Sequence, residues 1–400
     1  MRSTSSVFVA TALACASAAV QGAPFTVFDA RSMGMGGAGV ASARTANAAL
    51  FNPALLAAAR GGEDFGLVLP AIGAAIYDED EIIDAVDRIQ DEEIPALEAA
   101  YDAANQPAIE GAAAQLASSL RSIDHKQAFA EFGAGIGVSI PGRRFGTALN
   151  ISGYGVAGAT PVVAAADLTQ LDAIASGAPL PDPTDSLLSE VNAVAAAIGE
   201  IGLSFAHGMP LGNHRLAIGV TPKLQEVQAY DYTARVDDDN GFETDDITDT
   251  EVSDTSVNLD AGVALRLGEA GHWRLGLVVR NLIAHDIETA QGATIEFEPQ
   301  ARFGVAHHTR VTTITVDADL TENQPVAFGD KTQFIAAGAE FDLFGWAQAR
   351  VGYRHNLSDG PDKDLTTLGL GFSPFGIGID VAAFLADGSA GGVLQFGFHL

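Results

Sequence analysis

The chain has 400 residues, 44 of them glycine, and a formal net charge of −30 at pH 7. Nucleic acid repels such a polyanion, so the charge argues against a nucleic-acid partner. Hydrophobic residues make up 48% of the chain, yet beyond the first segment no apolar run reaches the length of about 18 residues that a membrane-spanning helix needs. A helical membrane protein is therefore excluded.

The N-terminal segment has the pattern of a secretory signal peptide. Arg2 supplies a positive charge, Val7–Val20 is mostly apolar, and small residues around Gln21 favour cleavage before Ala23. We predict that residues 1–22 are a signal peptide and that the protein is exported to the bacterial outer membrane.

A lipoprotein remains an alternative because Cys15 follows Ala12-Leu13-Ala14, although the Leu stands two residues before the Cys rather than the usual three. If Cys15 leaves with the signal peptide, the mature protein has no cysteine. It then has no disulfide, thiolate catalyst or cysteine metal site.

From about Phe65 onward the chain repeatedly alternates apolar and polar residues with a period of two, which predicts β-strands. The segments run about ten residues, enough for a tilted strand to cross a bilayer. One face of each is apolar and the other carries charged residues and glycines, as expected for a barrel lumen. The candidate strands begin near Phe65, Phe132, Phe145, Ile201, Arg215, Ser256, Trp273, Gln300, Val311, Thr332, Trp346, Leu365, Ile377 and Gly392.

The connections between these strands alternate between short and long. Residues 141–144 and 268–272 are typical short turns, whereas residues 78–130 and 157–199 are long insertions. A soluble β-sandwich has no reason for this alternation, but an outer-membrane barrel has short periplasmic turns and long extracellular loops. We therefore predict an all-β membrane protein, a 14-stranded antiparallel outer-membrane β-barrel over residues 63–400, with both termini in the periplasm.

The last segment agrees with this interpretation. Leu394, Phe396, Phe398 and Leu400 form an apolar stripe. Such a strand resembles the C-terminal signal that the outer-membrane assembly machinery recognises, although that signal usually ends in Phe. We expect this machinery and outer-membrane lipid to be partners.

The two long insertions have helical periodicity. Apolar residues in 79–104 and in 164–198 recur at the spacing of amphipathic helices, and residues 107–122 are rich in alanine. The helical inserts, near 78–130 and 157–199, are expected to be extracellular. Either they pack on one another as a lid, or they form a ligand vestibule or partner-binding cap.

The segment before the first strand is rich in small residues. Gly34, Gly36 and Gly39 match G-x-G-x-x-G, but this motif binds dinucleotides only between a strand and a helix of a βαβ unit, which is missing from the predicted elements. Together with Gly37, these glycines instead allow the backbone to pack closely inside a narrow space such as a barrel lumen.

The run from Phe28 to Val40, followed by Asn52-Pro53-Ala54, resembles the N-terminal hatch of the long-chain fatty-acid transporter superfamily, the FadL-like proteins. It is most similar to the branch named conjugal transfer protein TraF. The resemblance implies a fourteen-stranded barrel, plugged by a hatch over residues 23–62, that moves hydrophobic molecules. It also implies that Asn52, Pro53 and Ala54 hold the plug against the lumen wall. On the residues alone, Asn52-Pro53 caps and starts a short helix, and both roles are compatible.

Eleven charged residues are expected to face the lumen. Opposite charges inside a barrel most often pair and stiffen the wall, but the arginines could also orient a ligand carboxylate. The predicted lumen-lining charges are Asp260, Arg266, Arg274, Arg280, Arg302, Asp317, Asp319, Glu340, Arg350, Arg354 and Asp380.

The sequence offers no metal, cofactor or catalytic motif. His307 and His308 are adjacent, so they point to opposite faces of a strand. The loop 237–254 holds nine acidic residues but fails the EF-hand spacing, so a solvated loop is favoured over weak Ca²⁺ binding. We therefore expect no enzyme.

Two functions remain open. The first is passage of small hydrophobic molecules across the outer membrane through a hatch-plugged barrel, in which glycine-rich strands could bulge or kink to open a lateral exit. The alternative is a structural or assembly component of the cell envelope or of a conjugative transfer apparatus.

Overall fold

The computed structural model describes most of the chain. Most of the predicted signal peptide and residues 237–249 of the acidic loop lie outside the described residues. The described ranges are 19–21, 28–58, 64–236, 250–292, 294–323, 331–358, 364–386 and 388–399.

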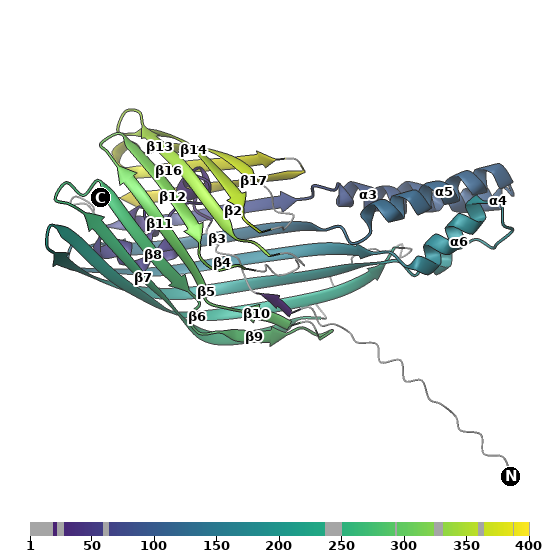
Figure 1. Ribbon diagram of the computed structural model, residues 1–400, viewed down its shortest axis with the longest axis horizontal. Helices are drawn as coiled ribbons and strands as arrows, with labels where there is room; N and C mark the ends of the chain where they lie inside the picture. Colours follow the sequence, from purple (N-terminus) through teal and green to yellow (C-terminus); the bar gives the residue numbers. More distant parts are fainter. Residues whose placement is uncertain are drawn as a thin grey trace, which may run out of the picture.

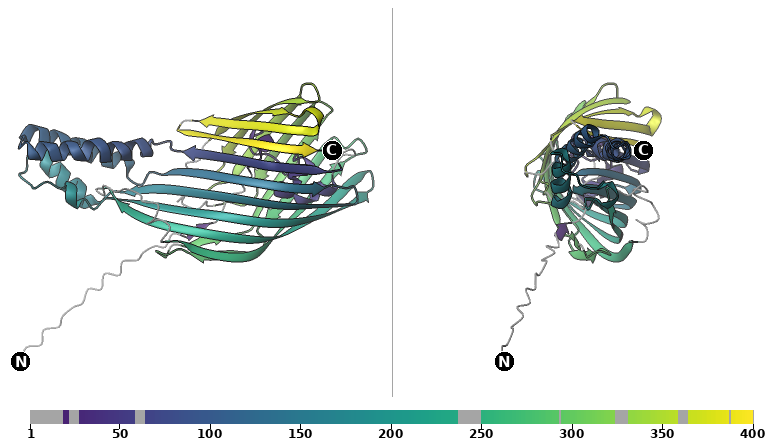
Figure 2. Two further views of the ribbon diagram at one scale, coloured as in Figure 1. Left: turned by 180° about the vertical axis from the view of Figure 1, so that it is seen from behind. Right: turned by 90° about the vertical axis from the view of Figure 1, so that its right-hand side faces the viewer.

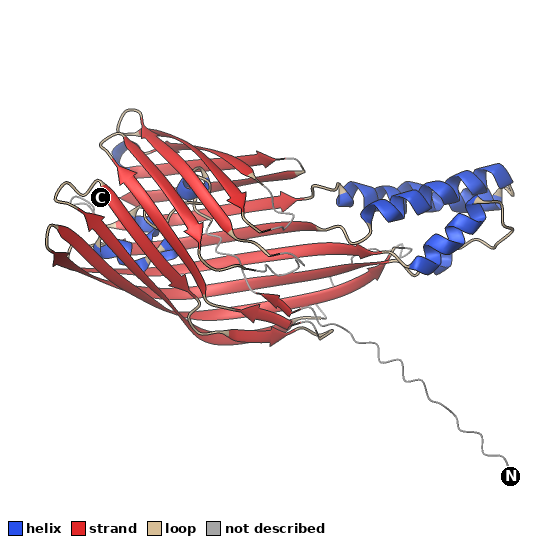
Figure 3. Ribbon diagram, viewed as in Figure 1, coloured by secondary structure: helices blue, strands red, loops and turns tan. Residues whose placement is uncertain are grey.

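Fourteen antiparallel strands close into a barrel, as predicted (Figures 1 and 3). Each barrel strand pairs with the barrel strands before and after it in the chain, β8 and β11 included, and β17 pairs with β2 to close the circle. The strands are β2 (Gly66–Tyr77), β3 (Ala128–Ile140), β4 (Phe145–Val162), β5 (Glu190–Leu211), β6 (His214–Arg235), β7 (Val252–Leu267), β8 (Trp273–Arg280), β11 (Gln300–His308), β12 (Thr312–Asp319), β13 (Phe334–Asp342), β14 (Ala347–Asn356), β15 (Leu365–Phe372), β16 (Ile377–Ala386) and β17 (Ser389–His399).

The period-two pattern divides the wall into an apolar outer face and a polar inner face. On β15, Leu368 and Leu370 point outward and are 63% and 69% exposed, whereas Thr367 points inward and is 2% exposed. Such an outer surface would be unstable in water but suits a bilayer. Within the described ranges, no helix is long and apolar enough to cross a membrane.

The wall is much taller on one side than on the other. β5 and β6 each have 22 residues, whereas β12 has 8. At about 3.3 Å per residue, these lengths correspond to roughly 70 Å and roughly 26 Å. The tall side therefore rises beyond the rest of the barrel at the end that carries the long connections (Figure 2).

The second insertion was predicted wrongly in part. Val191 and Val194 were placed in a helix, but β5 begins at Glu190 and pairs with β4 from Val162 onward. In this alanine-rich stretch the few large apolar residues fit both the helical and the strand period. The stretch forms a strand because pairing with β4 satisfies its backbone N–H and C=O groups.

Helices from both insertions pack together into one unit beyond the strand ends (Figure 3). Within it, α5 buries Ile109, Ala113, Leu116 and Leu120 along one face, opposite Leu171 of α6. The predicted mutual packing of the inserts is thus present, although the helices project away from the strands in Figure 1. We call this unit the helical cap; it comprises α3 (Ile82–Arg88), the π-helical η3 (Ile89–Glu93), α4 (Ile94–Asp102), α5 (Gln106–Ile123) and α6 (Ala165–Ala175).

A short hairpin within the connection 281–299 was not predicted. β9 (His285–Glu288) pairs with β10 (Thr294–Phe297), and Ile287, Ile295 and Phe297 join a buried cluster that lines the tall side of the lumen. The rings of His285 and Phe297 stack with centroids 4.6 Å apart. The hairpin therefore fills space inside the mouth of the barrel.

The first and last barrel strands, β2 and β17, pair with each other. The start of β2 at Gly66 meets the end of β17 at His399, at the end of the barrel that has the short turns. The described part of the predicted signal peptide lies at the other end, and the predicted mature N-terminus at Ala23 lies outside the described residues. β1 (Ala19–Gln21) pairs with β10 at the opposite end, and Phe28 lies in the lumen against Gly73 and Gly133.

Candidate functional site: the hatch and the chamber beside it

Residues 28–58 form the hatch, which fills the lumen at the end with the short turns. Its backbone turns tightly through four short helical segments, and most of its residues are buried. Arg274 reaches it from β8, and the N–H of Gly142 donates to the carbonyl oxygen of Leu56. The segments are α1 (Ala30–Met33), η1 (Thr45–Asn47), α2 (Ala48–Phe51) and η2 (Pro53–Ala57).

Glycines on the inner face of the wall pack directly against the hatch. A Cβ atom at Gly352 would lie 2.1 Å from the backbone N of Gly36, and one at Gly276 would lie 2.4 Å from the carbonyl oxygen of Val40. These glycines serve close packing rather than an open wall, which differs from the predicted role in a lateral exit. The wall glycines whose Cβ would clash first with the hatch are Gly73, Gly133, Gly146, Gly219, Gly262, Gly276, Gly338 and Gly352.

The hatch glycines make the matching turn. Gly36 and Gly37 have φ of +74° and +88°, a region that favours glycine. The N–H of Gly36 donates to the Oγ1 of Thr367 at 2.9 Å, and Gly34 faces Gly369 at the wall. The glycine-rich motif therefore builds a plug inside a barrel and has no strand–helix phosphate site.

Asp317 on β12 anchors the next turn of the hatch. Its Oδ2 accepts the N–H of Gly39 at 2.7 Å and the N–H of Val40 at 2.8 Å. Sequence reasoning placed Asp317 among the lumen-lining charges, and the structure shows that its partner is hatch backbone.

Asn52 has both roles that were considered for it. Its Oδ1 accepts the N–H of Ala54 at 3.1 Å and so caps η2, which begins at Pro53. Its Nδ2 donates to the carbonyl oxygens of Val40 and Val263, at 3.2 Å and 3.1 Å. One amide thus joins two parts of the hatch and the wall.

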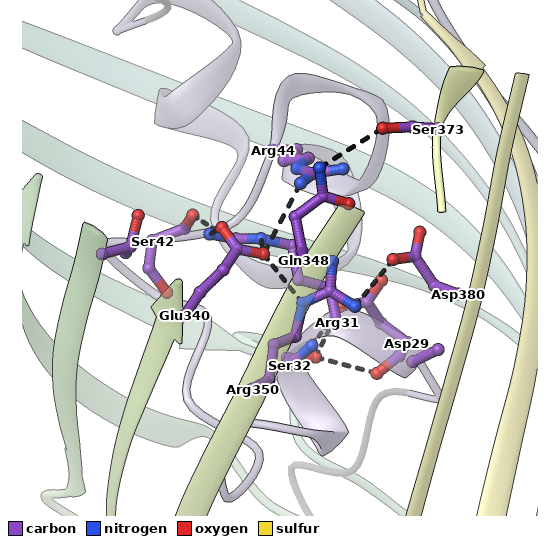
Figure 4. Close-up of polar contacts among 12 residues, drawn as sticks. Asp29, Arg31, Ser32, Ser42, Arg44, Glu340, Gln348, Arg350, Ser373 and Asp380 are labelled. Atoms are coloured by element: carbon purple, nitrogen blue, oxygen red, sulfur yellow. Dashed lines mark hydrogen bonds and ion pairs between the residues drawn. The ribbon is translucent and has the colours of Figure 1, made fainter. Parts of the chain in front are cut away.

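A buried ionic cluster ties α1 to β13 and β14 (Figure 4). Arg31 binds Glu340 through two bonds, Nε to Oε2 and Nη2 to Oε1, each 2.9 Å long. Arg350 reaches Glu340 with its Nε at 2.7 Å and Asp380 with its Nη1 at 2.7 Å. Arg44 adds a longer contact of 3.5 Å. Glu340 therefore accepts from three arginines, two of which belong to the hatch.

A second buried cluster lies on the tall side of the wall. Lys223 binds Glu200 at 3.0 Å and Asp260 at 3.1 Å, and its side chain is 1% exposed. Arg280 reaches the same two carboxylates at 3.4 Å and 3.7 Å. Two cations and two anions thus balance one another.

The remaining predicted charges also have structural contacts. Arg302 pairs with Asp319 at 2.5 Å, Arg274 donates to the carbonyl oxygens of Ala41 and Ala58, and Arg354 lies 4.3 Å from the ring centre of Phe334. Arg266 lies against the turn at Gly271. The structure therefore favours pairing and hatch anchoring over free ligand-binding arginines.

Sequence reasoning missed Arg31, Lys223 and Glu200, which complete these clusters. Lys223 and Glu200 alternate in phase with the residues of β6 and β5 that point into the lumen. This alternation could have identified both residues as lumen-facing. The start of β5 was misplaced, so Glu200 was not assigned to a face. Arg31 stands in the recognised hatch run, but nothing local indicates a partner 309 residues away.

Beside the hatch lies a small chamber of about 60 Å³. One side is apolar, formed by Phe28 and Leu50 of the hatch, Tyr154 and Ile198 of the wall and Phe297 of the hairpin. The other side is polar and includes the Glu200 and Arg280 ends of the second cluster. The polar lining residues are Ser152, Glu200, Gln225, Arg280, Asn281 and Gln300.

An open apolar groove of about 890 Å³ lies on the opposite, membrane-facing side of the same wall. Small outward residues such as Ala134, Ala197 and Gly199 line it together with the exposed Ile72 and Phe132. Groove and chamber share Ala134, Gly153, Tyr154 and Ile198. A single layer of β-sheet separates the groove from the chamber. In this layer β3 and β4 pair without interruption from Ala128 to Ile140.

Within the described part of the chain, no group of histidine and acidic residues could hold a metal ion. His307 lies beside Trp273 on the outer face, while Nδ1 of the buried His308 lies 3.1 Å from Oγ1 of Thr313. The adjacent histidines thus face opposite ways.

Comparison with known proteins gives a family and a fold. The family model described as "F plasmid transfer operon, TraF, protein" matches residues 49–319. Comparison with curated proteins found no sequence relative.

Solved structures of outer-membrane channels share the fold at low identity. The toluene transporter TbuX of Ralstonia pickettii has a TM-score of 0.52 and 10% identity, covering 94% of this chain and 100% of its own. A FadL homologue of Pseudomonas aeruginosa has a TM-score of 0.51 and 11% identity, covering 95% and 99%. A TodX monoaromatic hydrocarbon channel mutant has a TM-score of 0.51 and 11% identity, covering 93% and 98%.

Proposed function

This chain belongs to the TraF family of the F plasmid transfer operon and has the fold of the FadL-like outer-membrane barrels, and on that premise we propose that it passes small hydrophobic molecules across the outer membrane. The observation that carries the proposal is the chamber beside the hatch, one sheet away from an apolar groove that faces the bilayer. The two sites share four wall residues, so a molecule dissolved in the membrane and one bound in the lumen would be neighbours.

The lining of the chamber suits a small molecule with an apolar body and at most one polar group. Phe28, Tyr154 and Phe297 offer aromatic surface, while Gln225 and Asn281 offer hydrogen-bonding groups on the facing side. TbuX, a protein of this fold, is a toluene transporter. Compounds of that size are the first substrates to test.

The chamber must widen to hold such a ligand. An apolar cavity of about 150 Å³ accommodates benzene, whereas this one has about 60 Å³. Two of its walls do not belong to barrel strands, since Phe28 and Leu50 come from the hatch and Phe297 from the β9–β10 hairpin. We expect ligand binding to displace one of them.

The test is uptake of radiolabelled toluene by cells that lack the chromosomal gene and carry a plasmid copy. A Cβ at Gly135 would make only ordinary contacts of 3.7 Å or longer, so Gly135→Phe can place a ring in the chamber without disturbing the strand. The matched control is Gly137→Phe on the same face, two residues away and outside the chamber lining, where the nearest contact is 3.5 Å. We expect Gly135→Phe to reduce uptake severalfold and the control to leave it unchanged.

The alternative is a structural or assembly role in the cell envelope or in a conjugative apparatus, and the helical cap favours it. The cap packs around a buried cluster that also includes Val191 at the start of β5, and it projects beyond the strands, as a contact surface for a partner would. Unchanged uptake in a deletion strain, together with lost mating or lost envelope-complex assembly, would reject the transport proposal. Export by the signal peptide and recognition of the last strand by the assembly machinery are part of either proposal.

A further inference from the structure

The exposed cations of this acidic protein are distributed unequally between the two ends of the barrel. At the end with the long connections, each of three exposed cations is paired with a carboxylate: Arg121 with Asp172 at 2.5 Å, Lys126 with Asp80 at 3.0 Å, and Lys331 with Glu322 at 2.9 Å. Their charges are thus compensated within the protein.

At the end with the short turns the exposed cations are uncompensated. Arg143 and Arg144 stand in the turn between β3 and β4, and Arg310 stands in the turn between β11 and β12. Among the residues that the structure describes, none of the three has a carboxylate within 4.0 Å. In a chain of net charge −30, these three exposed arginines have no carboxylate partner among the described residues and can therefore bind an external anion.

Each of the two turns adjoins the same arrangement of rings on the lipid-facing surface. Phe145 is 67% exposed and lies 4.7 Å from the ring of His207, and Trp273 is 50% exposed and lies 4.7 Å from the ring of His307. The guanidinium carbon of Arg144 lies 5.7 Å from the ring centre of Phe145. Amphipathic rings of this kind mark the level at which lipid headgroups begin.

We propose that these two turns bind the phosphate groups of anionic phospholipids in the leaflet next to the short turns. The inference rests on the proposed placement in the outer membrane. The rings lie at the boundary of the apolar surface, and the arginines follow them directly in space, at the level of the lipid phosphates. Arginine binds phosphate oxygens through several N–H donors at once, which suits the phosphodiester of a lipid headgroup.

The two turns adjoin the lipid-facing surface, and this position indicates that the anion they bind belongs to a lipid. Phe145 and Trp273 belong to the apolar surface that faces the bilayer, so a phospholipid can cover the rings with its acyl chains and the arginines with its headgroup at the same time. A basic residue near a membrane surface contributes about fivefold to the affinity for anionic lipid.

The test is lipid retention by the purified full-length protein in native mass spectrometry, with equal amounts of phosphatidylglycerol and phosphatidylethanolamine of identical acyl chains. We expect the wild type to retain phosphatidylglycerol preferentially. The variant R143Q/R144Q/R310Q should lose this preference, because each turn should lose roughly fivefold in affinity for phosphatidylglycerol for each of its own arginines that is removed. The matched control R121Q/K126Q/K331Q removes three exposed cations from the other end and should keep the preference.

Equal retention of the two lipids by the wild type would overturn the proposal, as would an equal loss in the control. A preference for lipopolysaccharide that depends on the same three arginines would also overturn it, because that lipid belongs to the other leaflet. The uptake test remains separate: Gly135→Phe should keep the lipid preference, and R143Q/R144Q/R310Q should keep uptake, so failure of one proposal is distinguishable from failure of the other.

Discussion

Arg31 of the hatch and Glu340 of strand β13 form a buried ion pair with two parallel hydrogen bonds of 2.9 Å. The two residues are 309 positions apart, and each is less than 10% exposed in its side chain. The Nη1 of Arg31 also donates to the carbonyl oxygen of Ser42 at 2.8 Å, so one guanidinium joins both halves of the hatch to the wall. This relationship makes the plug part of the folded barrel rather than a loose insertion.

The first prediction concerns this pair. Glu340→Gln leaves Arg31 and Arg350 buried without their shared carboxylate, and removing one partner of a buried pair typically costs about 3–5 kcal/mol. We expect the midpoint of urea unfolding in lipid vesicles to fall and the hatch to become sensitive to protease. Glu322→Gln, which removes the partner of the exposed Lys331, should change neither.

The second prediction concerns the wall glycines. Gly352→Ala places a Cβ 2.1 Å from the backbone N of Gly36, which the rigid hatch turn cannot accommodate without moving. We expect the plug to shift and the ion conductance of single barrels in planar bilayers to increase. Gly378→Ala is the control, since its nearest contact is 3.6 Å. Equal conductance of the two variants would show that the hatch is not held by this contact.

The third prediction concerns the turn at Gly39 and Val40. Asp317→Ala removes the acceptor of both N–H groups, and a hydrogen bond to a charged group contributes about 1.5–3 kcal/mol. Amide hydrogen exchange should therefore accelerate at these two residues, measured by mass spectrometry of peptides from the hatch. Asp317→Asn keeps one side-chain oxygen and should show a smaller effect; identical exchange in both variants would contradict the anchoring role.

The fourth prediction concerns the second ionic cluster. Lys223→Met leaves Glu200 and Asp260 to share Arg280, whose contacts to them are 3.4 Å and 3.7 Å. The uncompensated buried charge should destabilise the barrel by about 3–5 kcal/mol, seen as a lower denaturant midpoint. Lys331→Met removes an exposed lysine and serves as the control. If Lys223→Met unfolds like the wild type but changes uptake, the cluster serves ligand binding instead.

The fifth prediction concerns the helical cap. Leu116 is fully buried between α5 and its neighbours, and a Leu→Ala change at such a site costs about 2–5 kcal/mol. We expect Leu116→Ala to expose the cap to protease while the closed barrel, whose strands contribute only Val191 at the start of β5 to the buried members of this cluster, keeps its resistance. Loss of barrel resistance at the same protease concentration would show that cap and barrel unfold together.

Most of the barrel could be predicted because strand alternation and loop length are local features. Leu368 and Thr367 reveal their faces through their neighbours in the chain, and a turn such as 268–272 is short wherever it lies. The glycine-rich hatch was also identifiable, since few other places in a protein require so many small residues together. Where local features were ambiguous, as at Val191, the prediction was wrong.

The partners of the charged side chains could not be predicted in this way. Nothing near Arg31 in the chain indicates Glu340, and nothing near Asp317 indicates that its acceptor oxygen would meet hatch backbone. These pairings depend on the barrel closing and on the depth at which the plug sits, both of which are set by contacts between residues hundreds of positions apart. The period-two pattern specifies the direction of each side chain, but only the folded chain brings opposite charges together.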